Sequence, residues 1–108
     1  MIAKTMFMNN PASFGGYNPP FDYPWYVYLL SCGDGSYYVG CTSNLHERLH
    51  RHSQGWVPST KGRLPIQLVM YHVFGNKYQA YTHEKYLKSG SGRAFTFRHL
   101  VPRQADNE

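Results

Sequence analysis

The chain has 108 residues, the usual length of one domain, which leaves room for one compact core with short appendages. Its 11 lysines and arginines outnumber its 6 aspartates and glutamates, an excess that favours a polyanionic partner, DNA or else RNA. Two cysteines are too few for a disulfide-stapled secreted protein, and no apolar run approaches the roughly 20 residues of a membrane span. We therefore expect a soluble protein in a reducing compartment (cytoplasm, nucleoid or nucleus) with no membrane partner.

The two ends of the chain differ in composition from the middle. In residues 1–24, proline, glycine and asparagine interrupt every helical or strand pattern, so this part is an extension and not a domain. Either it is flexible or loosely docked, or its aromatic side chains contact a protein partner. Residues 101–108 form a polar tail. The folded domain is expected at residues 25–100.

The first structural signal is a β-hairpin. Residues 25–31 and 37–41 are rich in β-branched and aromatic side chains, and Gly33-Asp34-Gly35 between them is a strong turn signal. We expect Cys32 to lie opposite Ser36 and to close the loop.

That closure fixes which side chains share a face. Tyr28 then lies opposite Gly40 and Leu30 opposite Tyr38, so the two tyrosines are diagonal neighbours on one face. Cys41 lies opposite Val27, far from Cys32, which argues against a disulfide.

The remaining elements follow in chain order. A helix capped by Thr42 or Ser43 is expected to run to about Gln54 and to stop at Gly55. The later segments are a basic loop at 55–65, a third strand at 66–74, a second helix at about 77–88 and a final helix at about 93–100. The predicted fold class is α+β, a small and mostly antiparallel three-stranded sheet flanked by helices, in the order strand, strand, helix, strand, helix, helix.

Two polar side chains lie at the edge of the apolar stripe of the first helix. His52 shares a helix face with Leu45 and Leu49, and Arg48 lies one turn from His52. Arg48 can extend from the rim of the core to solvent, and His52 can be a partly buried helix-end histidine. A catalytic role for either is the alternative.

Glu84 breaks the pattern of the second helix, because it lies between Ala80 and Leu87 on the apolar stripe. A carboxylate there is costly unless a cation or hydrogen-bond donors compensate its charge. The partner is either a basic side chain, Arg48 or a lysine, or a hard divalent metal ion.

The ordered motifs resemble one known family. They are Tyr26-Val27-Tyr28, Tyr38-Val39-Gly40, the run from Gly40 to His52 that contains Arg48, the run from Pro58 to Pro65, and the run from Glu84 to Arg93. Residues 25–100 thereby resemble the GIY-YIG nuclease family, especially its small stand-alone members similar to the nuclease module of bacterial excision repair. Tyr26 stands where the first motif has glycine.

The resemblance implies a metal-dependent endonuclease that hydrolyses DNA phosphodiester bonds, structure-selective in repair or recombination. Its catalytic residues would be Tyr28, Tyr38, Arg48, His52 and Glu84, with Glu84 also holding one Mg²⁺ or Mn²⁺ ion. Tyr28 is favoured as general base and Tyr38 as the group that positions water or phosphate. His52 as proton relay stays an alternative, and the three assignments stay open.

Further side chains are candidates for substrate contacts. Basic residues can position phosphates and a tryptophan can stack on a base; the candidates are Lys61, Arg63, Lys85, Lys88, Arg93 and Trp56. Each can equally be ordinary solvated surface. Two rival functions are a module that binds nucleic acid without cutting it, and an interaction protein whose extension recruits a partner.

Overall fold

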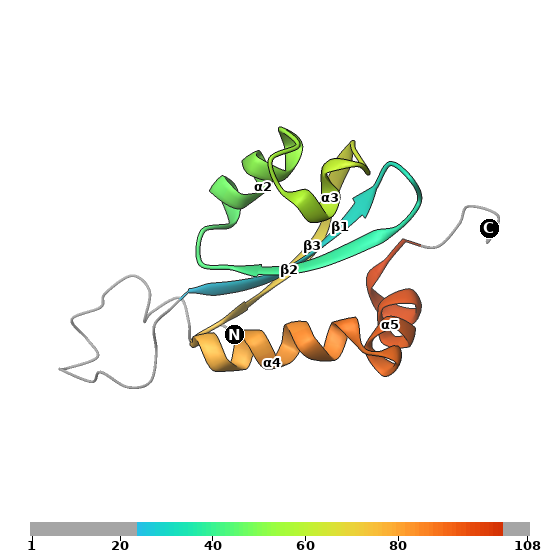
Figure 1. Ribbon diagram of the computed structural model, residues 1–108. Helices are drawn as coiled ribbons and strands as arrows, with labels where there is room; N and C mark the ends of the chain where they lie inside the picture. The colour runs from blue at the N-terminus through green and yellow to red at the C-terminus, as the bar shows by residue number, and fades with distance from the viewer. Residues whose placement is uncertain (1–23, 103–108) are drawn as a thin grey trace.

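The hairpin predicted from the sequence forms the middle of the fold. Strand β1 spans Trp25–Cys32 and strand β2 spans Tyr37–Thr42, in a computed structural model that describes residues 24–102 (Figure 1). The Cys32 amide donates to the Ser36 carbonyl at 2.8 Å and closes the turn as expected.

The register of the hairpin is the predicted one. The strands are antiparallel and pair Tyr28 with Gly40, Leu30 with Tyr38 and Val27 with Cys41. Both cysteines are free thiols, as this register requires.

The third strand completes the sheet. Strand β3 spans Ile66–Phe74, the predicted segment, and pairs antiparallel with β1, which gives the order β2-β1-β3. Because β1 is central, it is buried without interruption from Val27 to Leu30. Strand β2 lies at one edge of the sheet.

Helix α2 begins later than the sequence predicts. It spans Leu45–Ser53, and the Asn44 side chain caps it by accepting the Glu47 amide at 3.1 Å. The expected cap at Thr42 or Ser43 is wrong, because Thr42 still belongs to β2 and its hydroxyl accepts the Asn44 amide at 3.0 Å. The side chain one step further along is therefore free to cap the helix.

For the segment after α2, residues 55–65, the sequence predicts a loop throughout. This prediction is wrong for part of the segment. Gly55 stops α2 in the left-handed conformation, φ +77°, as expected. Residues Pro58–Lys61 then form a further short helix, α3. Proline at the first helical position has a φ that already suits a helix, which explains why this turn forms.

The second predicted helix is confirmed with its bounds. Helix α4 spans Lys77–Lys88, and Asn76 caps it by accepting the Gln79 amide at 2.9 Å.

The final helix begins earlier than the expected Arg93. Helix α5 spans Gly90–Phe95 and continues as the wider helix η2, Thr96–Leu100. Ser89 accepts the Gly92 amide at 3.2 Å and caps it, so the glycines lie inside the helix and do not precede it. Gly92 is buried, and a Cβ atom there would collide with the backbone of α4.

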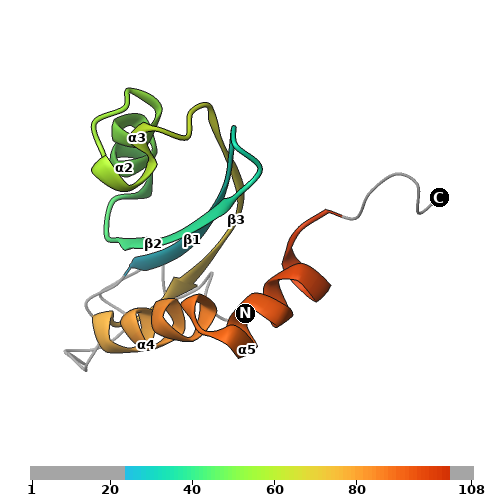
Figure 2. The same cartoon turned by 45° about the vertical axis from the view of Figure 1, so that its right-hand side comes forward.

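The helices cover both faces of the sheet. Helices α2 and α3 lie on one face, and α4 and α5 lie on the other (Figures 1 and 2). The hydrophobic core fills the space under α4, where Val27 packs with Ala80 and Leu87. Within residues 24–102, no helix is long and apolar enough to cross a membrane. The predicted extension up to residue 23 and the tail from residue 103 lie outside the described residues.

Candidate active site

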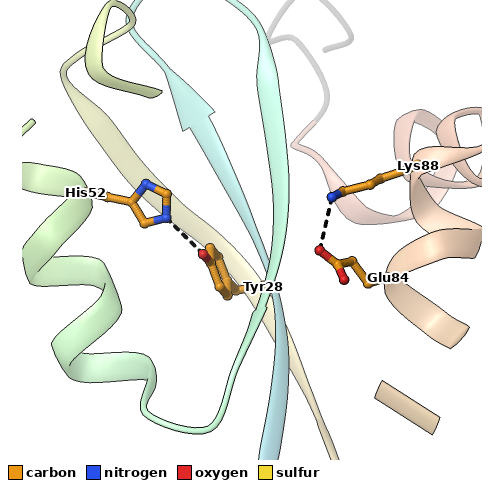
Figure 3. A network of polar contacts seen from close by, with 4 residues as sticks. All are labelled: Tyr28, His52, Glu84 and Lys88. Atoms are coloured by element: carbon orange, nitrogen blue, oxygen red, sulfur yellow. Dashed lines mark hydrogen bonds and ion pairs between the residues drawn. The ribbon is translucent and has the colours of Figure 1, made fainter. Parts of the chain in front are cut away.

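A buried hydrogen-bonded chain joins β1, α2 and α3. The Tyr28 hydroxyl lies 2.8 Å from His52 Nε2 (Figure 3). On the other side of the ring, His52 Nδ1 lies 2.7 Å from the Thr60 hydroxyl. All three side chains are completely buried. Both ring nitrogens of His52 are therefore satisfied, which fixes the position of the imidazole.

Burial keeps the side chains of this hydrogen-bonded network uncharged at neutral pH. Desolvation, aided by the nearby positive charge of Arg48, lowers the pKa of His52 below its ordinary value of 6.5. The pKa of Tyr28 is raised, mainly by desolvation and to a smaller extent by the neighbouring Tyr38. The positive charge of Arg48 offsets this only in part. A neutral imidazole accepts at one nitrogen and donates from the other, so it suits the two hydroxyls that flank it.

Tyr38 lies between His52 of α2 and Lys88 of α4, which belong to helices on opposite faces of the sheet. Its ring centre is 6.4 Å from that of Tyr28 and 5.3 Å from that of His52. Two cations approach the same ring at 6.0 Å, Arg63 from beyond α3 and Lys88 from α4. Unlike Tyr28, Tyr38 is only partly buried, so it is the motif tyrosine that solvent reaches.

Gly40 makes room for the end of the Tyr28 side chain. A Cβ atom at this position would collide with the ring and hydroxyl of Tyr28. A glycine in the interior of a strand often marks such a close approach. The Tyr28 hydroxyl therefore lies against the backbone of the edge strand.

The predicted arginine and glutamate both influence one residue of β1 and one of β2 near Gly40. Glu84 contributes to raising the pKa of Tyr28, which Arg48 lowers. At the neighbouring Cys41, desolvation and then Glu84 raise the pKa to about 11, while Lys88 and Arg48 counteract them. Arg48 and Glu84 thus lie within electrostatic reach of the same two residues.

Glu84 approaches β2 from the opposite side to His52. Its carboxylate pairs with Lys88 Nζ at 3.0 Å, one helical turn further along α4 (Figure 3). The cationic partner left open in the sequence is therefore a lysine and not Arg48. The side chain of Glu84 is 22% exposed and that of Lys88 is 50% exposed, so the pair is accessible to a ligand.

The residues around Glu84 fit only one kind of metal site. Within residues 24–102, no group of three or more histidine, cysteine, aspartate or glutamate side chains could hold an ion. One accessible carboxylate fits a hydrated Mg²⁺ or Mn²⁺ ion whose other ligands are waters and substrate phosphate oxygens. It does not fit a cage made of protein ligands.

The predicted substrate contacts divide between the two sides of the sheet. Arg63 donates to the Ser59 carbonyl at 2.9 and 3.2 Å and to the Ser36 hydroxyl at 2.7 Å, so it ties α3 to the hairpin. Lys61 and Trp56 are exposed on the same side. The exposed cations on the other side are Lys85, Lys88 and Arg93.

The fold and this constellation can be set beside known proteins. The family model of the GIY-YIG catalytic domain matches residues 24–97. The chain belongs to the GIY-YIG family. A GIY-YIG catalytic domain implies chemistry of the nuclease type, and the matched span contains all five predicted catalytic residues.

Proteins of similar sequence come from several bacteria. A UPF0213 protein of Clostridium perfringens is 44% identical over 64 residues, which are 58% of this chain and 69% of that protein. A UPF0213 protein of Streptococcus pyogenes is 32% identical over 84 residues, 77% of this chain and 91% of that protein. The solution NMR structure of a UPF0213 protein from Bacillus halodurans is similar at 33% identity, 70% and 84% coverage and a TM-score of 0.46.

Sequence reasoning missed one member of the buried hydrogen-bonded network, Thr60. It follows His52 by eight residues, in a segment predicted to be a loop, so no helical spacing connects the two. The signal was Pro58-Ser59-Thr60, a proline that can begin a helix followed by hydroxyl side chains.

Proposed function

We propose that this protein is a metal-dependent endonuclease that hydrolyses DNA phosphodiester bonds. The observation that carries the proposal is the position of Tyr38, a tyrosine that is only partly buried. It has a buried neutral hydrogen-bonded chain behind it and, across β2, an accessible carboxylate paired with a lysine. Hydrolysis of a phosphodiester needs an oriented water, a cation for the phosphate charge and a neutralised leaving oxygen, and these groups can supply all three.

The two tyrosines divide the work by burial. Tyr28 is completely buried and bonded to His52, so it does not touch the substrate in this arrangement. Tyr38 orients the attacking water, its hydroxyl oxygen accepting a hydrogen bond from that water. Tyr28 and His52 hold the Tyr38 ring in place. This reverses the preference for Tyr28 that the sequence alone suggested.

The charged residues act on the phosphate. Arg48 contacts a non-bridging phosphate oxygen through its planar guanidinium group. A divalent ion held by Glu84 would neutralise charge on the phosphate and leaving oxygen and lower the pKa of a bound water. Lys88, released from Glu84, contacts a neighbouring phosphate.

The test is nicking of supercoiled plasmid in Mg²⁺ or Mn²⁺. We expect Glu84→Gln and Arg48→Ala each to reduce nicking below detection, with far-ultraviolet circular dichroism and melting temperature unchanged. The matched controls are Glu47→Gln and Arg51→Ala, which alter the same residue types at exposed positions on α2 and keep full activity.

Two outcomes would contradict the proposal. Full activity of purified Glu84→Gln protein would exclude the role of that carboxylate. Tight DNA binding without cleavage by the unaltered protein in either metal would favour the rival function, a binding module. An RNA of the same sequence, tested in parallel, separates the two polyanions.

A further inference from the structure

Next to Tyr38, on the α4 and α5 side of the sheet, the surface is hollowed into a groove of about 500 Å³. We call it the hairpin groove, because β2 and the hairpin turn form one wall and the end of α4 with α5 and η2 forms the other. Its chemically distinctive lining residues are Tyr37, Tyr38, Lys88, Arg93, Thr96 and Phe97. The proposed function already uses two of these, Tyr38 and Lys88.

One end of the hairpin groove offers an aromatic surface. Phe97 is 60% exposed although it is large and apolar. Its ring meets Tyr37 edge to face, with ring centres 5.8 Å apart, so the contact holds it in place. This geometry leaves a flat ring face available for stacking by a planar ligand.

The same groove carries positive charge. Arg93 and Lys88 line it and are both exposed, Lys88 being the partner of Glu84. Among residues 24–102, the structure shows no carboxylate in the lining. An anionic group attached to the planar ligand would therefore be attracted here.

A buried hydroxyl in the lining lacks a partner. Thr96 is only 5% exposed, and its Oγ1 makes no hydrogen bond in the described part of the chain. An unsatisfied buried polar group is costly, and such groups are few in native proteins. A hydroxyl both donates and accepts, so it can pair with either kind of atom on the edge of a nucleobase.

We infer that the hairpin groove binds one unpaired nucleotide of the strand being cut. The base stacks on Phe97 and hydrogen-bonds to Thr96, and the adjoining phosphate contacts Arg93 and Lys88. This inference rests on the proposed function, and it adds a substrate preference for DNA with a bulge, flap or single-stranded segment. The groove volume of about 500 Å³ is typical of a site for one small ligand.

The test compares two DNAs that differ only in one unpaired nucleotide. Fluorescence anisotropy in EDTA measures binding of a fully paired duplex and of the same duplex with a single-nucleotide bulge, so no cleavage is needed. The unaltered protein binds the bulged DNA more tightly. Phe97→Ala loses about five-fold or more of that preference, the contribution expected from stacking of one base.

Two further variants make the result specific. Tyr78→Ala removes another exposed aromatic, on α4 and outside the groove, and keeps the full preference. Thr96→Val keeps the shape of the side chain and removes the hydroxyl, and it reduces bulge binding without reducing the melting temperature. A merely structural Thr96 would leave bulge binding unchanged in this variant.

The outcomes separate this inference from the proposed function. Plasmid nicking by the unaltered protein with equal binding of the two DNAs would overturn the inference alone. A bulge preference that survives Phe97→Ala would also overturn it. Failure to nick any DNA, with the Phe97-dependent preference present, would overturn the proposed cleavage and leave a nucleotide-binding groove.

Discussion

The side chains on the two sides of strand β2 differ in burial and in charge. On the α2 and α3 side, Tyr28, His52 and Thr60 are completely buried, neutral and joined by hydrogen bonds. On the α4 side, Glu84 and Lys88 are charged and accessible and lie beside an open groove.

Solvation explains the difference. A buried charge without a close partner is very costly, so the completely buried positions under α2 and α3 hold neutral hydrogen-bonding groups. The charged residues that act on phosphate must lie where water and substrate can reach them. We therefore assign the completely buried hydrogen-bonded network to positioning, and the side chains that solvent reaches, Arg48 of α2 included, to substrate contact.

The sharpest way to break this assignment is to remove one hydroxyl at a time. Tyr38→Phe is expected to reduce the rate of plasmid nicking by about 100-fold, because the attacking water loses the hydroxyl that orients it. Tyr28→Phe is expected to keep most of the activity. It should instead lower the free energy of unfolding by about 1–3 kcal/mol, because His52 loses a partner inside the protein.

Single-turnover nicking and urea unfolding measure the two quantities separately. The reverse pattern, a large rate loss in Tyr28→Phe with Tyr38→Phe nearly normal, would assign the substrate contact to the buried network.

Gly40→Ala tests whether the close packing of Tyr28 against β2 matters. The added methyl group collides with the Tyr28 ring and should cost about 1–3 kcal/mol of stability, the usual cost of overpacking. Gly62→Ala is the matched control, because it has φ −88° and nothing within 4 Å of the added atom. Equal melting temperatures for the two variants would contradict the packing described here.

The smallest expected effect is a loss of stability on acidification. Because burial lowers the pKa of His52 in the folded state, the unfolded state binds a proton more readily, and stability falls as the pH drops through 6.5. The pKa of His83 is lowered in the same direction, by burial and then by His72. We expect His52→Gln to reduce this pH dependence without abolishing it.

Melting temperatures measured between pH 7.5 and 5.5 give the slope. The exposed His46→Gln variant should keep the slope of the unaltered protein, and an unchanged slope in His52→Gln would show that His52 is not the buried neutral group.

Local patterns were sufficient for the sheet and for α4. The turn signal between two β-branched runs fixes a hairpin register because the side chains of a strand alternate with a period of two. The Gly75-Asn76 turn signal and the periodic run that follows it predict the bounds of α4 in the same way. Arg48 and Glu84 stood out because each carries a charge where the helical pattern expects apolar packing.

The remaining features depend on contacts between segments far apart in the sequence. The cap of α2 depends on how far β2 continues, and the start of α5 depends on Gly92 packing against α4. The division of the two tyrosines into a buried and an accessible one could not be read from the hairpin, since both lie on one face. It follows from where α2 and α3 are placed over that face.

The edge position of β2 has a consequence for local motion. Its backbone is hydrogen-bonded to β1 on one side only, so Tyr38 and Gly40 belong to the strand that opens at lower free energy than β1. The outward-facing amides of β2 should therefore exchange with deuterium earlier than those of β1. A bound DNA strand lying along this edge would slow their exchange.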